Sequence, residues 1–134
     1  MKKIFYSILI VVSFLFCNCY ATDNEALYKK YKDVSDDINI INALELLDGT
    51  TGKYSKEAIL GKNLSNRPIK IEFLNLSTIN PMYTNFDALG WKRKKNLFIY
   101  INEKHKDAPI EALSAILAHE AIHQDEHNSL NEET

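Results

Sequence analysis

The chain has 134 residues, of which 46% are hydrophobic and 25% are charged, as in an ordinary globular protein with one domain. Its 16 basic and 18 acidic residues give a net charge of -2, so no broad basic surface is expected and nucleic acid is excluded as a partner. The one basic run, Lys92-Arg93-Lys94-Lys95, is short and lies beside a predicted strand. We interpret it as an exposed hairpin tip and not as a binding patch.

The first 21 residues have the order and length of a secretory signal peptide. Lys2-Lys3 gives a positive start, an apolar stretch follows from Ile4 to Phe16, and small residues lead up to Ala21. That stretch is shorter than the roughly 20 residues that span a bilayer. We therefore expect cleavage after Ala21, a secreted or periplasmic protein, and no membrane partner after cleavage. An uncleaved membrane anchor and a lipid-modified Cys17 or Cys19 are the alternatives.

Residues 22–134 are predicted to form a single domain without disulfides, because both cysteines lie in the signal segment. Such a domain is held together by its core and by any metal that it binds. A helix is expected from residue 23 to about residue 47, because apolar residues recur there at steps of three and four: Leu27, Tyr31, Val34, Ile38 and Ile41. A shorter helix is expected around Ser55 to Leu60, ended by Gly61.

Two strands and a central helix are predicted in the second half of the chain. The alternation of apolar and polar residues from Ile69 to Phe73 predicts a half-buried strand, and Leu97 to Ile101 is predicted to be a strand covered on both faces. The segment Asn75 to Gly90 shows no period and is interpreted as a long loop that either forms a wall of a site or passes over one. From Ile110 to about Gln124 the sequence is apolar nearly all round, as in a helix buried in the middle of a domain. These elements predict an α+β fold.

The last of these helices carries the run His119-Glu120-Ala121-Ile122-His123, which is the HExxH signature of zinc metallopeptidases. Histidines at i and i+4 lie on one side of a helix, so His119 and His123 can offer two nitrogens to one Zn²⁺. Glu120 projects about 100 degrees away, beside the metal but outside its ligand set. It can act there as general base for a water that the metal activates. Two partly exposed histidines near a helix end are the simpler interpretation.

A third ligand is needed, because zinc in proteins normally has at least three protein ligands. His127 continues the series, but on an unbroken helix it lies about 12 Å along the axis from His119, too far for one ion. Asn128-Ser129 followed by Glu132 has the pattern of a capping box, so a new helix is predicted to begin at Ser129. Glu132 or Glu133 in its first turn would complete the site. Glu133 is slightly favoured, because Glu132 is used in capping.

With these residues the chain resembles the gluzincin group of zincin metallopeptidases, in which a strand precedes the HExxH helix and a glutamate follows on the next helix. It is more closely similar to small uncharacterised bacterial secreted proteins that share HEAxH, four residues, then NSxxEE, which here is His119 to His123 and Asn128 to Glu133. The similarity extends back through Phe86-Asp87-Ala88 and Ile99 to Asn102, and so covers most of the predicted domain.

This resemblance implies a zincin-like fold, a zinc ion bound by His119, His123 and a glutamate, and Glu120 as the general base. It also implies that the strand before the motif helix lines the cleft and pairs with an extended substrate. In this chain that strand is Leu97 to Ile101. The main-chain groups of Leu97, Ile99 and Ile101 are expected to bind the substrate.

The chain stops at Thr134, about one turn into the helix that holds the third ligand in this pattern. A helix of one turn is not stable alone, so we expect a truncated C-terminal helix and a weakened zinc site. The first expected function is an exported zinc-dependent metallopeptidase that acts on peptide or protein substrates. The second is a catalytically inactive zincin-like domain that binds peptide or cell-envelope material. A structural secreted domain with incidental histidines is the third.

Overall fold

The computed structural model describes residues 23–49 and 52–129, and within the last helix it describes side chains as far as Asp125. The predicted signal peptide, its cleavage point after Ala21 and the domain boundary at residue 22 lie outside the described residues. The chain up to Lys30 belongs to one unit and the chain from Tyr31 to another, and the sheet and its covering helices belong to the second unit. No helix in the described ranges is long and apolar enough to span a membrane.

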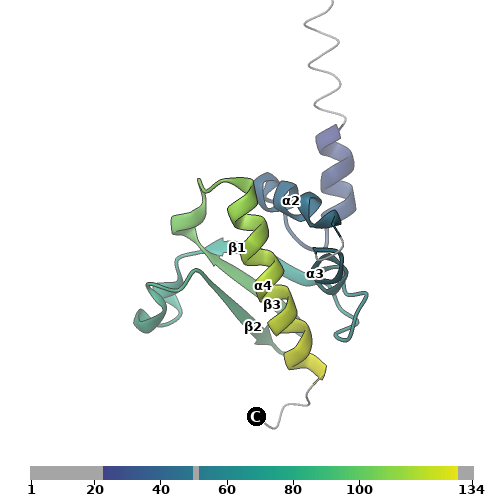
Figure 1. The fold of residues 1–134 in the computed structure, drawn as a ribbon. Coiled ribbons are helices and arrows are strands. Elements are labelled where there is room, and N and C mark those ends of the chain that lie inside the picture. Colours follow the sequence, from purple (N-terminus) through teal and green to yellow (C-terminus); the bar gives the residue numbers. More distant parts are fainter. Residues whose placement is uncertain (1–22, 50–51, 130–134) are drawn as a thin grey trace, which may run out of the picture. The chain divides into compact units, whose positions relative to one another are not determined.

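The described residues form an α+β fold, as predicted, with four helices and a small three-stranded sheet (Figure 1). The first helix is residues 23–31. The other helices are α2 (Ile38–Glu45), α3 (Gly52–Ile59) and α4 (Ile110–Ser129), and the strands are β1 (Ile69–Leu74), β2 (Ala88–Arg93) and β3 (Asn96–Asn102).

The helix predicted over residues 23–47 is interrupted, so the prediction of one continuous helix is wrong. Residues 32–37 are turns and irregular chain, and α2 begins anew after Asp37. The Asp37 carboxylate accepts hydrogen bonds from the main-chain N–H groups of Asn39 and Ile40 at 2.9 and 3.3 Å, which is an N-cap arrangement. A side chain that satisfies these donors favours a new helix start at this point, although the apolar spacing continues through it.

The short helix predicted from Ser55 to Leu60 is confirmed as α3, which begins earlier, at Gly52. The chain leaves this helix through Gly61, whose φ of +72° lies in the left-handed region. The main chain of a neighbouring segment also leaves no room for a side chain at this residue. A Cβ on Gly61 would lie 2.3 Å from the carbonyl carbon of Arg67 and 2.5 Å from the nitrogen of Pro68. Both the backbone conformation and the contact therefore require glycine here.

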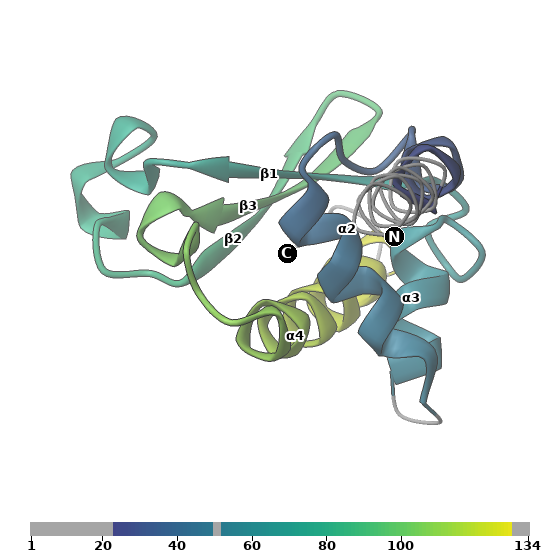
Figure 2. The ribbon, with the colours of Figure 1, turned by 90° about the horizontal axis from the view of Figure 1, so that it is seen from above.

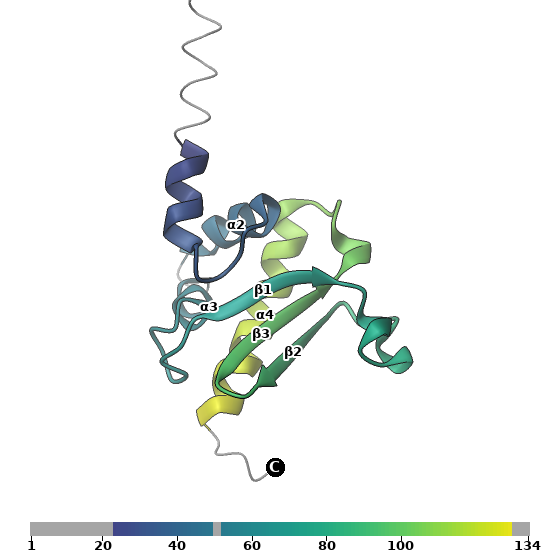
Figure 3. The same ribbon diagram turned by 180° about the vertical axis from the view of Figure 1, so that it is seen from behind.

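β3 is the central strand of the sheet, with β1 parallel to it on one side and β2 antiparallel on the other (Figure 3). β1 and β3 confirm the two predicted strands. β2 begins inside the segment 75–90, so the prediction of a loop is wrong at its end. The run Ala88-Leu89-Gly90 has no alternation and no β-branched residue. It becomes a strand because a turn at Lys94-Lys95, the predicted hairpin tip, folds it onto β3.

The helices of the second unit lie on one face of the sheet (Figures 2 and 3). α4 packs against β2 and β3, and α2 and α3 pack against α4. The side chains of the covered face are fully or almost fully buried: Ile69, Ile71, Leu97, Ile99 and Ile101. On the other face, Phe98 and Tyr100 stack with their ring centroids 5.5 Å apart and stay half-exposed. No described helix of the second unit lies on this second face, so the predicted covering of β3 is only partial there.

α4 is longer and less buried than predicted. It runs without a break to Ser129, so the predicted end near Gln124 is wrong, and the helix predicted to follow from Ser129 lies outside the described residues. The segment contains neither glycine nor proline, and a capping pattern alone does not end a helix. The face with Leu113, Leu117 and Ala121 is buried, whereas residues such as Ala115 and Ile122 are exposed. The sequence of this helix looks apolar on every side because several of its residues are alanines. An alanine can lie on the surface, so the apolar pattern did not require the whole helix to be buried.

We predict that Gly61→Ala lowers the free energy of unfolding by at least about 2 kcal/mol, because both the left-handed backbone and the main-chain contacts oppose a Cβ. Gly49→Ala is the matched control, since a Cβ at Gly49 meets nothing within 4 Å and its φ of -69° suits alanine. The control is expected to stay within about 0.5 kcal/mol of the parent. Urea unfolding followed by circular dichroism measures both variants. Equal stability of the two would contradict the turn described at Gly61.

Candidate functional site

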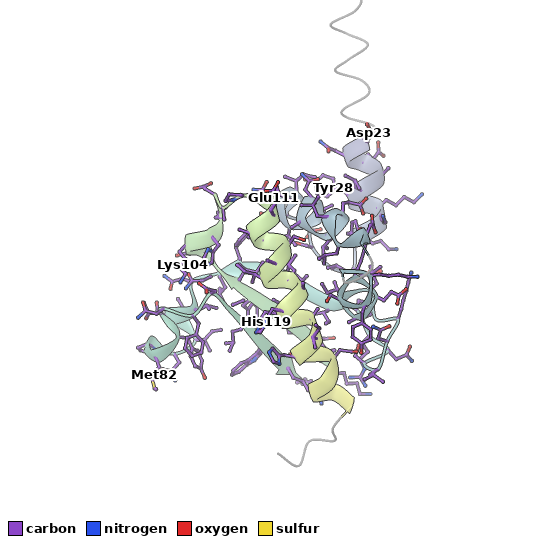
Figure 4. The ribbon with its side chains drawn as sticks, viewed as in Figure 1. Asp23, Tyr28, Met82, Lys104, Glu111 and His119 are labelled. Atoms are coloured by element: carbon purple, nitrogen blue, oxygen red, sulfur yellow. The ribbon has the colours of Figure 1, made fainter. Side chains whose placement is uncertain are left out.

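The two motif histidines lie on the exposed side of α4 and face one another. Figure 4 shows His119 about midway along this helix. The Nε2 atoms of His119 and His123 are 3.1 Å apart, and the ring centroids are 4.5 Å apart with the planes at 76°. Both side chains are exposed. The one-turn spacing of the two residues thus brings their outer nitrogens to a common point in front of the helix.

This separation fits two nitrogen ligands on one zinc ion. With Zn–N bonds of about 2.05 Å and tetrahedral angles, two such nitrogens lie about 3.3 Å apart. With the same bond lengths, the observed distance of 3.1 Å between the two nitrogens corresponds to an N–Zn–N angle of about 98°. The same two atoms can instead share one proton, but a single hydrogen bond between exposed side chains contributes only about 1 kcal/mol. The donor set therefore suits a divalent cation that prefers imidazole.

No described side chain joins the two histidines as a third potential ligand. Within residues 23–49 and 52–125, no group of three histidine, cysteine, aspartate or glutamate side chains comes together as a metal site. The predicted ligands Glu132 and Glu133 lie outside the described residues. His127 is on α4, and because that helix is unbroken, its main chain lies about 12 Å along the axis from His119. The described part of the site is thus a pair of ligands.

A cleft of about 520 Å³ adjoins the histidine pair. One wall is α4, and the other is residues 85–88, which lead into β2. The residues that line it from α4 are Ala115, Ile116, His119 and Glu120. Glu120 is half-buried, and it lines the same cleft as His119. The segment predicted to be the wall of a site does line this cleft at its C-terminal end.

α4 lies tightly against β2 at Gly90. A Cβ on Gly90 would meet the Oε1 atom of Gln124 at 2.5 Å, so the glutamine side chain occupies the space that a larger residue would need. The Nε2 atom of Gln124 also donates to the carbonyl oxygen of Trp91 at 3.4 Å. Gln124 is buried and directly follows His123. This contact therefore sets the position of the histidine pair relative to β2.

β3 is not available to a substrate. Its main chain is paired with β1 on one side and β2 on the other, and Leu97, Ile99 and Ile101 are buried. The implied role of these three residues in pairing with an extended peptide is therefore wrong, because a central strand has no free main-chain groups. The sheet topology moves any such role to β2, which is an edge strand beside α4.

The hydrogen-bond pattern shows which groups of β2 face outward. The N–H of Asn102 donates to the carbonyl oxygen of Asp87 at 2.8 Å, so these two residues form a hydrogen-bonded pair. Such pairs alternate along an antiparallel ladder, and the main chains of Ala88 and Gly90 therefore point away from β3. Within the described part of the chain, these outward groups form no hydrogen bond. They offer an extended peptide an open edge.

Asn102, which was not predicted as a site residue, holds the wall of the cleft. It is 6% exposed, and its Nδ2 atom donates to the carbonyl oxygens of Thr84 and Phe86 at 3.0 and 2.9 Å. Its Oδ1 atom accepts from the N–H of Lys104 at 3.2 Å. A primary amide has the two donors and the acceptor that this position requires. The signal in the sequence is a polar residue at the end of an apolar strand.

Asp87, at the same wall, is the centre of a charged cluster. Its Oδ1 atom lies 2.9 Å from Nζ of Lys104, which is labelled in Figure 4, and 2.8 Å from Nε2 of His105. Lys104 also donates to the carbonyl oxygen of Asn85 at 3.1 Å. Hydrogen bonds from Lys104 and His105 hold the pKa of Asp87 below its usual value. These contacts add to those of Asn102 in fixing the wall.

Asp125 anchors α4 on the side away from the histidines. Its side chain is fully buried and accepts hydrogen bonds from the Tyr54 hydroxyl and the Ser65 N–H, both at 3.0 Å. The Ser55 hydroxyl donates to the carbonyl oxygen of Ala118, also at 3.0 Å. These bonds tie α4 to α3 and the loop after it, and they fix the rotation of α4. The histidine pair is thereby directed outward.

No family model matches the chain, and no curated protein or solved structure is significantly similar to it.

We predict that Asn102→Ala lowers the free energy of unfolding by about 1–3 kcal/mol, because two carbonyl groups of the wall lose their partner. The amide hydrogen of Phe86, which bonds to the carbonyl oxygen of Tyr83 at 3.0 Å, is expected to exchange faster. Asn75→Ala is the control, since that exposed side chain only caps a local turn. Unchanged hydrogen exchange at Phe86 in Asn102→Ala would show that the wall does not depend on this residue.

Proposed function

We propose that this protein is an exported zinc-dependent metallopeptidase of the zincin type, which hydrolyses peptide bonds in peptide or protein substrates. The observation that carries the proposal is the placement of three motif side chains. The Nε2 atoms of His119 and His123 face one another at 3.1 Å, and Glu120 lines the same cleft as His119. The resemblance of the HExxH sequence to zincins supports it.

Each residue has a separate task in this proposal. His119 and His123 hold the zinc ion, which when bound polarises the scissile carbonyl and activates the attacking water. Glu120 takes a proton from the attacking water and passes it to the leaving amine. Its half-buried position in the cleft suits this role, because a general base must stay within hydrogen-bond reach of the proton that it takes.

The third zinc ligand in this proposal is Glu133, with Glu132 as the alternative. Two ligands alone make a weak zinc site, and a carboxylate completes the His₂Glu set that is common among zinc peptidases. Replacing each glutamate by glutamine in turn shows which of the two binds zinc, because zinc affinity falls only when the ligand loses its charge.

The substrate is proposed to lie in the cleft as an extended chain against β2. The outward main-chain groups of Ala88 and Gly90 supply hydrogen bonds that do not depend on substrate sequence. The cleft itself has apolar lining from Phe86, Ala115 and Ile116, which suits an apolar side chain next to the cleaved bond.

The second candidate function is a zincin-like domain that binds peptide or cell-envelope material without cleaving it. The observation in its favour is that the described side chains supply two zinc ligands and not three. The open edge of β2 would serve binding equally well. Peptide turnover separates the two candidates, because a binding domain retains peptide affinity and produces no new amino termini.

We predict that His119→Ala and His123→Ala each lower zinc affinity by more than about 100-fold, because each removes one of very few ligands. His105→Ala is the matched control, since its imidazole is paired with Asp87 and not with the motif histidines. Zinc titration calorimetry on the three variants measures the effect. Full zinc occupancy in both motif variants would place the metal elsewhere and refute the site.

We predict that Glu120→Gln keeps zinc bound and the fold intact but lowers peptide turnover by about 10²–10⁴-fold, because glutamine has the same size and no basic oxygen. A fluorogenic peptide library gives the turnover, and calorimetry gives the zinc affinity of the same preparation. Undiminished turnover would remove Glu120 from the mechanism. Absence of turnover in the parent, with zinc bound, would favour the binding domain.

A further inference from the structure

A second pocket lies at the end of the sheet where β1 and β3 begin, and its lining residues differ from those of the histidine cleft. Its volume is about 310 Å³. Figure 3 shows the start of β1 and the β2–β3 turn at this same end of the sheet. Three separate segments of the chain meet here: the turn at residues 32–33, residues 67–70 at the start of β1, and residues 95–97 at the start of β3.

The pocket has a strong excess of positive charge. Its lining contains four cationic side chains and one carboxylate, that of Asp33, which gives a formal charge of +3. The cations are those of Lys32, Arg67, Lys70 and Lys95. Among the described residues, none of these four side chains forms an ion pair, whereas Lys53, Lys56 and Lys104 all do.

This concentration of charge is unusual in a chain with a net charge of -2. Three further cations, Lys92 to Lys94, stand on the adjoining hairpin, so seven of the 16 basic residues lie in or beside the pocket. Acidic residues begin along the β1 edge, where Asp36 and Glu72 line a neighbouring pocket. Like charges brought together by folding repel one another, and a bound anion relieves that repulsion.

One of the cations is already oriented. The Nη1 atom of Arg67 donates to the carbonyl oxygen of Lys95 at 3.0 Å, which fixes the guanidinium across the gap between the starts of β1 and β3. Arg67 also precedes Pro68, whose ring restricts the local chain. A guanidinium held in this way keeps further N–H donors for a ligand and loses little freedom on binding it.

We propose that this pocket binds a phosphate group. A phosphate carries up to two negative charges and several acceptor oxygens around one centre, and it therefore matches a pocket that cationic side chains from three segments line. A carboxylate has only two oxygens and is satisfied by one guanidinium. The volume of the pocket accommodates a phosphate with part of the molecule that carries it. The proposal does not depend on zinc binding or on peptidase activity.

A phosphate group reaches such a pocket either as a small soluble ligand or as a lipid headgroup, and two arms of one experiment distinguish these sources. The first arm titrates the 134-residue chain with inorganic phosphate, with chloride as reference, and follows the amide signals of residues 67–70 and 95–97 by nuclear magnetic resonance. The second arm measures cosedimentation with phosphatidylglycerol vesicles and with phosphatidylcholine vesicles. Both use low ionic strength, because exposed charges are screened by salt.

The variants test the pocket itself. Lys70→Gln combined with Lys95→Gln removes two exposed cations without touching the core, and phosphate affinity is expected to fall at least about tenfold. Lys53→Gln combined with Lys62→Gln is the matched control, because it removes the same charge from exposed positions elsewhere and is expected to change affinity less than about twofold. Circular dichroism checks that both double variants fold.

Binding in either arm that only the pocket variant weakens supports the proposal, and the arm that shows it identifies the source of the phosphate. Phosphate binding no tighter than chloride, together with no preference for phosphatidylglycerol over phosphatidylcholine vesicles, would overturn the proposal. Equal weakening by the pocket variant and the control would also overturn it, because the effect would then come from net charge alone.

Discussion

α4 packs across one face of the sheet, and α2 and α3 pack in turn against α4, so this helix determines how the whole second unit is assembled. Leu113, Leu117 and Ala121 bury one side of this helix, and Asp125 fixes its rotation through hydrogen bonds to α3 and the following loop. With that rotation set, the residues between the buried positions must point outward, including both motif histidines. The absence of a side chain at Gly90 lets the same helix lie close to β2. The cleft between helix and strand results from these two contacts together, so the geometry of the candidate metal pair is a property of the core.

Much of this fold could be predicted from local patterns, and the errors have physical causes. β1 and β3 were predictable because the alternation of apolar and polar residues is a local signal. The end of α3 before Gly61 was predictable for the same reason, since glycine is the residue that most easily adopts a left-handed backbone. β2 was not predictable in this way, since its run Ala88 to Gly90 forms a strand only through pairing with β3. The break after the first helix depends on the cap at Asp37, which competes with an apolar spacing that continues through it. The histidine pair was predictable because helical geometry alone sets its spacing, whereas the wall held by Asn102 joins segments that are distant in sequence.

Two parts of the small sheet, the β2 edge and the end where β1 and β3 begin, have different surroundings. At the β2 edge, the cleft combines an apolar lining with the half-buried carboxylate of Glu120. At the end where β1 and β3 begin, four cations surround a pocket with a single carboxylate. Seven of the 16 basic residues thus lie in or beside this pocket, whose lining residues differ from those of the cleft proposed for catalysis. Separation of this kind allows a phosphate-bearing ligand and a peptide to bind without competing for the same side chains.

In the proposed function, the open edge of β2 limits the conformations in which a partner can bind. Main-chain hydrogen bonds to Ala88 and Gly90 require a partner segment whose own N–H and C=O groups are free and extended. Folded proteins keep most such groups paired inside their helices and sheets. Peptides, chain termini, long loops and unfolded proteins meet the requirement whatever their sequence. A protein that binds its partner through this edge therefore selects first for chain segments that are not folded, and only then for particular side chains.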